Sequence, residues 1–126
     1  MSYLLDTHVL LWWFQKPGSL LQKAQSAIQQ RSQGVYVSSV STWEILIKRS
    51  LGKIRVPNRL FSFIKSQGFL ELPITIEHTL GLTELPLYHQ DPFDRLLVAQ
   101  AQAENLILIT ADTHIMEYDV RIIKAK

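Results

Sequence analysis

Residues 3–7 have the sequence YLLDT, a short apolar run that stops abruptly at Asp6 before a segment typical of a helix. A strand that is buried on both faces appears in a sequence as a continuous hydrophobic run. In open α/β sheets, ligands bind just beyond the carboxyl ends of such strands. We therefore expect a buried first strand over residues 3–6 and a functional role for Asp6.

The rest of the chain alternates segments typical of strands with segments typical of helices. Apolar runs predict further strands over residues 35–37, 69–74, 106–109 and 121–123. Helical spacing or helix-start signals predict helices over residues 8–14, 19–32 and 75–82, around Glu44, after Asn58 and after Asp91. This alternation implies an α/β fold with a parallel sheet and helices on both faces. We expect one domain over residues 1–126, a length that can bury a sizeable core.

The composition limits the chemistry that the chain can support. It contains no cysteine, which excludes disulfides and thiolate metal ligands, so a metal here would be held by oxygen or imidazole, and a hard cation such as Mg²⁺ fits best. No apolar run approaches the roughly 20 residues that a membrane span needs, and the N-terminus lacks a basic leader. We expect a cytoplasmic protein with no membrane contact.

Three more acidic residues occupy positions like that of Asp6. Glu44 and Asp94 lie near the starts of helical segments, and Asp112 follows the second continuously apolar strand. If these four acids share one pocket, the remaining chain carries 13 basic against seven acidic residues. A basic body around an acidic pocket suits a polyanion held over a metal, although the overall net charge of +2 is ordinary for a soluble protein.

Glu44 and Asp94 each have a structural alternative. Ser41 and Glu44 match the S-x-x-E capping box, in which Glu44 would only bond the backbone of Ser41. However, Glu44 also continues an apolar row of its helix with Ile47 and Leu51, which favours an inward position. Asp91 before Pro92 is typical of a helix N-cap and is interpreted as structural. Asp94 lies on the same helical face as the apolar residues that follow, so its carboxylate is expected to be buried.

Four clustered carboxylates would repel one another unless a divalent cation compensates their charge. One bound Mg²⁺ can activate a water, and a second can stabilise the leaving oxygen of an in-line displacement, which is the chemistry of phosphodiester hydrolysis. We also expect helix N-termini at Glu44 and Asp94 to favour negative charge. The histidines (His8, His78, His89 and His114) lack zinc-binding spacing and are not assigned as ligands, although His8 and His114 could border the site.

Two further segments suggest contacts with other molecules. Five basic residues and no acidic one lie between Lys48 and Arg59; such a run is either a solvated surface or a contact with a phosphate backbone. The first helix is apolar nearly all round and carries Trp12 and Trp13, which point in different directions. Core packing or a subunit contact would account for it.

The motifs Leu5-Asp6-Thr7, Ser41 with Glu44, residues 91–95 (DPFDR) and Thr110-Ala111-Asp112 together resemble the PIN domain. The chain length resembles that of VapC-type toxins of type II toxin-antitoxin pairs. The resemblance implies a three-layer α/β/α sandwich with strand order 3-2-1-4-5 and a Mg²⁺- or Mn²⁺-dependent endoribonuclease. It implies metal ligation and catalysis by Asp6, Glu44, Asp94 and Asp112, of which Asp112 is the most variable position in the family. It also implies supporting hydroxyls at Thr7 and Thr110, a homodimer and a cognate antitoxin partner.

Two other functions fit the sequence less well. A non-catalytic PIN-like module that binds RNA or a partner would be expected to have lost an acid, and all four are present. A phosphatase with Asp6 as nucleophile would resemble the haloacid-dehalogenase group, which has a second aspartate where this chain has His8. DNA rather than RNA as the substrate stays open, because the acids alone do not distinguish the two.

Overall fold

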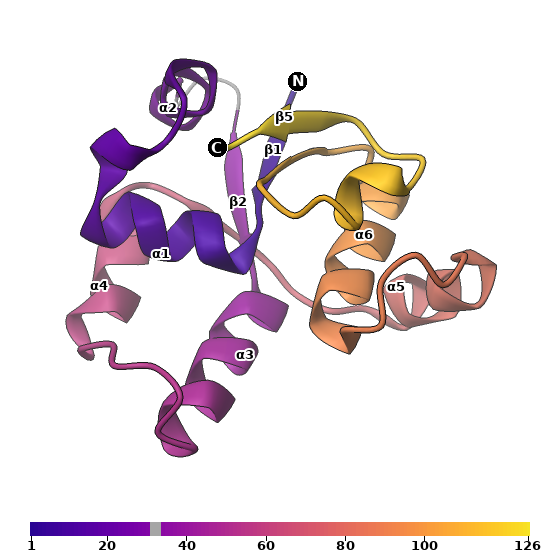
Figure 1. Cartoon of the computed structure of the whole chain (residues 1–126), viewed down its shortest axis with the longest axis horizontal. Helices are drawn as coiled ribbons and strands as arrows, with labels where there is room; N and C mark the ends of the chain where they lie inside the picture. Colours follow the sequence, from indigo (N-terminus) through magenta and orange to yellow (C-terminus); the bar gives the residue numbers. More distant parts are fainter. Residues whose placement is uncertain (31–33) are drawn as a thin grey trace.

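A computed structural model describes residues 1–30 and 34–126 of the chain (Figure 1). Its centre is a five-stranded sheet in the order β3-β2-β1-β4-β5, in which every neighbouring pair is parallel. The strands are β1 (Tyr3–Leu5), β2 (Val35–Ser38), β3 (Leu70–Leu72), β4 (Ile107–Thr110) and β5 (Ile122–Lys124). The predicted parallel sheet and its strand order 3-2-1-4-5 are confirmed.

Helices cover both faces of this sheet, which confirms the predicted three-layer sandwich. The helices are α1 (Thr7–Gln15), α2 (Gln22–Gln29), α3 (Ser39–Ser50), α4 (Arg59–Ser66), α5 (Ile76–Gly81) and α6 (Pro92–Glu104). Along β1, Leu5 joins a core cluster with α1 and α2, whereas Leu4 joins a second cluster with α6. Figure 1 shows α1 and α2 on one side of the sheet and α5 and α6 on the other.

Two predicted elements differ from the structure in extent. The helix expected over residues 19–32 is a 3-10 turn, η1 (Pro17–Ser19), followed by the shorter α2, and residues 31–33 lie outside the described part of the chain. The strand expected over residues 69–74 is reduced to β3, which ends before Pro73. Proline has no N–H to donate to a strand ladder, so pairing cannot extend through that position.

The buried face of α1 is formed by apolar residues, as the sequence predicted. In α1, Val9, Leu10 and Trp13 are buried, while Trp12 is only half-buried. The Trp13 indole N–H donates to the side chain of Gln67 at 3.0 Å. The two tryptophans therefore point in different directions, as predicted, and Trp13 belongs to the core.

A buried polar contact connects α3 to α6 at the carboxyl edge of the sheet. Ser38 caps α3, because its Oγ accepts a hydrogen bond from the backbone N–H of Val40 at 3.0 Å. The same hydroxyl donates to the side-chain oxygen of Gln100, which is fully buried in α6. A buried polar group is costly to leave without a partner, so this contact helps to hold the two helices in one relative position.

No helix in the described ranges has both the length and the apolar character that crossing a membrane requires.

Asp91 is the N-cap of α6: its Oδ1 accepts from the backbone N–H groups of Phe93 at 2.8 Å and Asp94 at 3.4 Å. We expect Asp91→Ala to lower the free energy of unfolding by about 1 kcal/mol, as the loss of a helix cap usually does. Asp91→Asn keeps the acceptor oxygen and should retain the stability of the wild-type chain. Urea unfolding of the three proteins measures both effects; equal stability of all three would show that the cap contributes nothing.

Candidate active site

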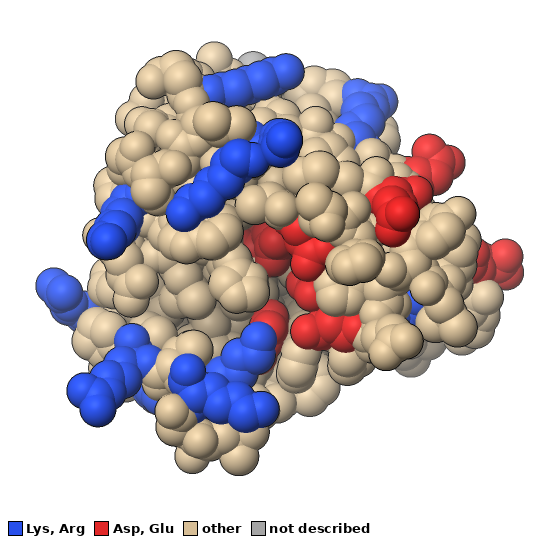
Figure 2. Space-filling view, viewed as in Figure 1, with Lys and Arg blue, Asp and Glu red and all other residues tan. Residues whose placement is uncertain are grey.

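The structure brings the four predicted acids together at the carboxyl edge of the sheet. Asp6 follows β1, Glu44 lies in α3, Asp94 lies in the first turn of α6, and Asp112 follows β4. Asp6 and Glu44 are each only 2% exposed, and Asp94 is also buried. Figure 2 shows acidic side chains gathered in a hollow at the centre of this face. The four acids thus form one cluster at the carboxyl edge of the sheet.

Asp6 lies deepest in this cluster. The hydroxyl of Thr110, at the end of β4, donates to Asp6 Oδ2 at 2.6 Å. Burial raises the pKa of Asp6, and the nearby charges of Asp112 and Glu44 add to this effect, against the lowering influence of Thr110 and His8. The Thr110 hydroxyl expected to support the acids therefore contacts one directly. The Thr7 hydroxyl instead donates to Ser41 at 2.9 Å.

The side chain of Glu44 is buried, but neither the capping box nor the full apolar row read from the sequence is present around it. The helix begins earlier than the proposed capping box requires, with Ser38 as the N-cap and Ser41 inside the first turn. Glu44 consequently lies beyond the first turn of α3, and the expected favourable helix N-terminus applies to Asp94 alone. The row predicted with Glu44 also ends differently, because Leu51 is 63% exposed.

Lys48 supplies the cation that accompanies Glu44. It lies one turn later in α3, and its Nζ donates a hydrogen bond to Glu44 Oε2. This hydrogen bond raises the pKa of Lys48 above its ordinary value. An acid that is buried needs such a partner, because desolvation of an isolated charge is expensive. The pair was not predicted from the sequence, although its i, i+4 spacing was available.

The surroundings of Asp94 disfavour the charged form of its carboxyl group. Burial raises its pKa to about 8, with repulsion from Asp6, Asp91, Glu44 and Asp112 acting in the same direction. In the protein without a bound cation, the carboxyl group is therefore mostly protonated near neutral pH.

The pKa of Asp112 is lowered, unlike that of Asp94, because its carboxylate accepts several hydrogen bonds. Its Oδ1 accepts from the backbone N–H groups of His114 at 2.8 Å and Ile115 at 3.1 Å. Burial acts to raise the pKa of Asp112, but the hydrogen bonds from His89, Ile115 and His114 outweigh that effect and lower it. Asp112 is thus an ionised acid at the outer side of the cluster.

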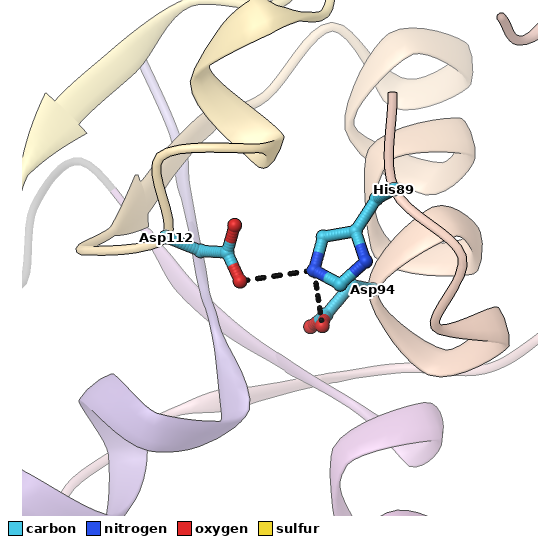
Figure 3. Close-up of side chains that lie close together, drawn as sticks. All are labelled: His89, Asp94 and Asp112. Atoms are coloured by element: carbon cyan, nitrogen blue, oxygen red, sulfur yellow. Dashed lines mark hydrogen bonds and ion pairs between the residues drawn. The ribbon is translucent and has the colours of Figure 1, made fainter. Parts of the chain in front are cut away.

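His89 also contacts two of the acids, a role that no sequence motif indicated. Its Nε2 lies 3.0 Å from Asp112 Oδ2 and 3.1 Å from Asp94 Oδ2 (Figure 3). It lies in the loop before α6, at a spacing that matches no metal-binding motif. The histidines expected near the site lie beside it: His8 is close enough to lower the pKa of Asp6, and the His114 ring lies 5.4 Å from the ring of His89.

Two oxygens in the cluster have no hydrogen-bond partner among the described residues: Asp6 Oδ1 and Glu44 Oε1. A buried oxygen without a partner carries a desolvation cost that a ligand can relieve. Asp94 and Asp112 also bring carboxylate oxygens within 4.8 Å of each other and of a ring nitrogen of His89. Carboxylate oxygens are the donors that hard divalent cations prefer, so the residues present fit Mg²⁺ or Mn²⁺.

Basic side chains lie mainly above and to the left of the acidic hollow in this view, whereas further acidic side chains lie to its right (Figure 2). The basic run between Lys48 and Arg59 was interpreted as either a solvated surface or a phosphate contact. In the structure, Lys48 is engaged by Glu44, and Arg49 donates to the backbone oxygen of Val56 and the side chain of Asn58. Lys53 and Arg55 are exposed. The run therefore divides into residues that hold the structure and residues that face solvent.

Comparison with known proteins identifies the family. The PIN domain family profile matches residues 3–120. Ribonuclease VapC22 of Mycobacterium tuberculosis is 25% identical over 120 residues, which cover 93% of this chain and 92% of that protein. VapBC2 from Rickettsia felis, solved with a DNA fragment from its promoter, has a similar chain with a TM-score of 0.76, 16% identity and full coverage of both chains. A chain of the DNA-bound VapBC from Salmonella typhimurium has a TM-score of 0.73 and 14% identity, with 98% of each chain covered. With a fold and a family profile that agree over nearly its whole length, this chain belongs to the PIN domain family.

Proposed function

We propose that this chain is a divalent-metal-dependent endoribonuclease, the toxin of a toxin-antitoxin pair. The observation that carries the proposal is the cluster of Asp6, Glu44, Asp94 and Asp112, in which two buried carboxylate oxygens lack a partner among the described residues. The name of the relative Ribonuclease VapC22 supports RNA as the substrate class.

In this proposal the four acids hold Mg²⁺ or Mn²⁺ and form the catalytic centre. When bound, the metal would activate water and stabilise the leaving oxygen of phosphodiester hydrolysis. Thr110 keeps the carboxylate of Asp6 in place, and Lys48 does the same for Glu44. The carboxyl group of Asp94 must release its proton before it can act as a ligand, because metal ligands bind in their deprotonated form.

The expected partners belong to the same proposal. Two similar structures are named as VapBC assemblies, which supports a small antitoxin as the partner of this chain. A homodimer and a cytoplasmic location remain predictions. Half-buried Trp12 on α1, together with exposed apolar side chains such as Ile76 and Leu80 on α5, leaves apolar surface that such partners could cover.

Neutralising a central acid should abolish cleavage. We expect Asp6→Asn and Asp94→Asn to reduce the rate of RNA cleavage by at least 100-fold, because each loses a charged oxygen ligand of the metal. Glu84→Gln is a matched control, since Glu84 is an exposed acid outside the cluster. Cleavage of a fluorescent RNA in the presence of Mg²⁺ or Mn²⁺ measures the rates, and an unchanged rate in either acid variant would refute the proposal.

Calorimetric titration with Mn²⁺ separates the enzyme from a non-catalytic PIN-like module. The nuclease should bind Mn²⁺, and Asp6→Asn should bind it more weakly. A chain that binds RNA but takes up no Mn²⁺ at millimolar concentration would favour the binding module.

The protonation of Asp94 predicts how stability depends on pH without metal. The unfolded chain loses the Asp94 proton near its ordinary pKa of 3.8, whereas the folded chain keeps it up to about 8. The folded state therefore binds the proton more tightly, and its stability falls as pH rises between these values. Asp94→Asn avoids this loss. In EDTA at pH 9 it should be more stable than the wild type by at least about 1 kcal/mol, or roughly 3 °C in Tm.

Thermal unfolding from pH 4 to pH 9 tests this expectation. The advantage of Asp94→Asn should shrink steadily as the pH is lowered toward 4, where the unfolded wild-type chain also begins to take up a proton at this position. A stability difference that does not change with pH would contradict the raised pKa of Asp94.

Exposed members of the basic run should contribute to RNA affinity. In an Asp6→Asn background, which leaves the substrate uncut, we expect Lys53→Ala combined with Arg55→Ala to weaken RNA binding. Each lost phosphate contact should also reduce the slope of log affinity against log salt by about 1. Lys23→Ala, an exposed cation on α2, serves as the control. Fluorescence anisotropy at several salt concentrations measures the slope. An unchanged slope would show that Lys53 and Arg55 face solvent and make no phosphate contact.

A further inference from the structure

We propose that His89 is a positioning residue. Its ring Nε2–H holds the carboxylate of Asp112 beside that of Asp94, in the place where both could bind a divalent cation. The inference rests on the proposed function, since it concerns the same metal site. It assigns a role to a histidine that neither the motif spacing nor the ligand set inherited from the resemblance includes.

The hydrogen bonds of the His89 ring define which nitrogen carries the proton. The backbone N–H of Asp91 donates to Nδ1 at 3.1 Å, so Nδ1 supplies a lone pair. With Nδ1 as an acceptor, the ring proton lies on Nε2. This N–H donates to Asp112 Oδ2 at 3.0 Å, and Asp94 Oδ2 lies 3.1 Å from the same nitrogen (Figure 3). One N–H therefore lies between two acids that would otherwise face each other.

This arrangement favours a supporting role over direct ligation. A ring nitrogen that carries a proton has no lone pair for a metal, and the lone pair on Nδ1 is already engaged by the backbone. Donors that orient ligating carboxylates are common around metal sites, and their loss typically reduces metal affinity by about 10- to 100-fold. His89 has the position and the hydrogen-bond pattern of such a donor.

The backbone of His89 is held by the same segments that carry the two acids. Its N–H donates to the hydroxyl of Tyr118 at 3.0 Å, and Tyr118 is buried in the segment that follows Asp112. Arg95, in the first turn of α6 beside Asp94, donates to that hydroxyl at 3.1 Å and to the backbone oxygen of Pro86 at 2.9 Å. The histidine is thus fixed to both segments and links them through its ring.

Asp112 needs this link more than the other acids do. It lies after the end of β4, and its side chain is 29% exposed, compared with 2% for Glu44. Its Oδ1 is held by backbone N–H groups, whereas His89 provides the contact to Oδ2 on the side that faces Asp94. Without the His89 N–H, Asp112 Oδ2 would lose the hydrogen bond that holds it toward Asp94, and the side chain could rotate away from the cluster.

The test compares variants by the affinity for Mn²⁺ alone, measured by calorimetry on the full chain. We expect His89→Ala to weaken Mn²⁺ binding about 10- to 100-fold. His89→Gln should recover most of this loss, because the glutamine amide offers an N–H near the position of Nε2 and an oxygen that can accept from Asp91. Gln90→Ala, an exposed neighbour in the same loop, is the matched control and should bind Mn²⁺ as the wild type does.

Nitrogen-15 NMR of the histidine rings tests the same inference on the unaltered chain, so it remains testable even if His89→Ala does not fold. We expect His89 to be protonated on Nε2 both without metal and with saturating Mg²⁺. A switch to protonation on Nδ1 when Mg²⁺ is added would show direct ligation and overturn the inference, as would unchanged Mn²⁺ affinity in His89→Ala. A wild-type chain that binds no Mn²⁺ would instead overturn the proposed function itself.

Discussion

Mutual repulsion among buried carboxylates is the constraint on which the organisation of this face depends. Asp6, Glu44 and Asp94 are all buried within electrostatic range of one another, where charges interact far more strongly than in water. The chain reduces this repulsion in two ways: a proton remains on Asp94, whose pKa rises to about 8, and Lys48 forms an ion pair with Glu44. Both features indicate a site built to accept positive charge.

The parallel sheet explains why distant residues meet. Strands β1 and β4 are neighbours at its centre, so the residues that follow them emerge side by side, and Thr110 connects the two by its hydrogen bond to Asp6. Helices α3 and α6 then bring in Glu44 and Asp94, and the contact between Ser38 and Gln100 links these helices. The position of the cluster thus follows from topology, as is general for the carboxyl edges of open α/β sheets.

The sequence predicted the sheet and the inward direction of Asp94 because those features depend on local patterns. Apolar runs identified the central strands, and Asp94 shares its helical face with buried residues. The start of α3 was misplaced because Ser38 and Ser41 are both good caps, and only tertiary packing selects Ser38. The roles of His89 and Tyr118 could not be predicted, since they depend on contacts between residues 29 positions apart.

The partners of the acids are distributed in a way that bears on metal binding. Asp6 and Glu44 each have one oxygen engaged, by Thr110 and Lys48, while the other oxygen has no partner among the residues described. Each engaged oxygen fixes the carboxylate plane, so the second oxygen is oriented before any ligand arrives. Such orientation reduces the entropy lost on binding. A cation that used the two free oxygens would not need to displace Thr110 or Lys48, but it would have to compete with protons, because the pKa values of Asp6 and Asp94 are both raised.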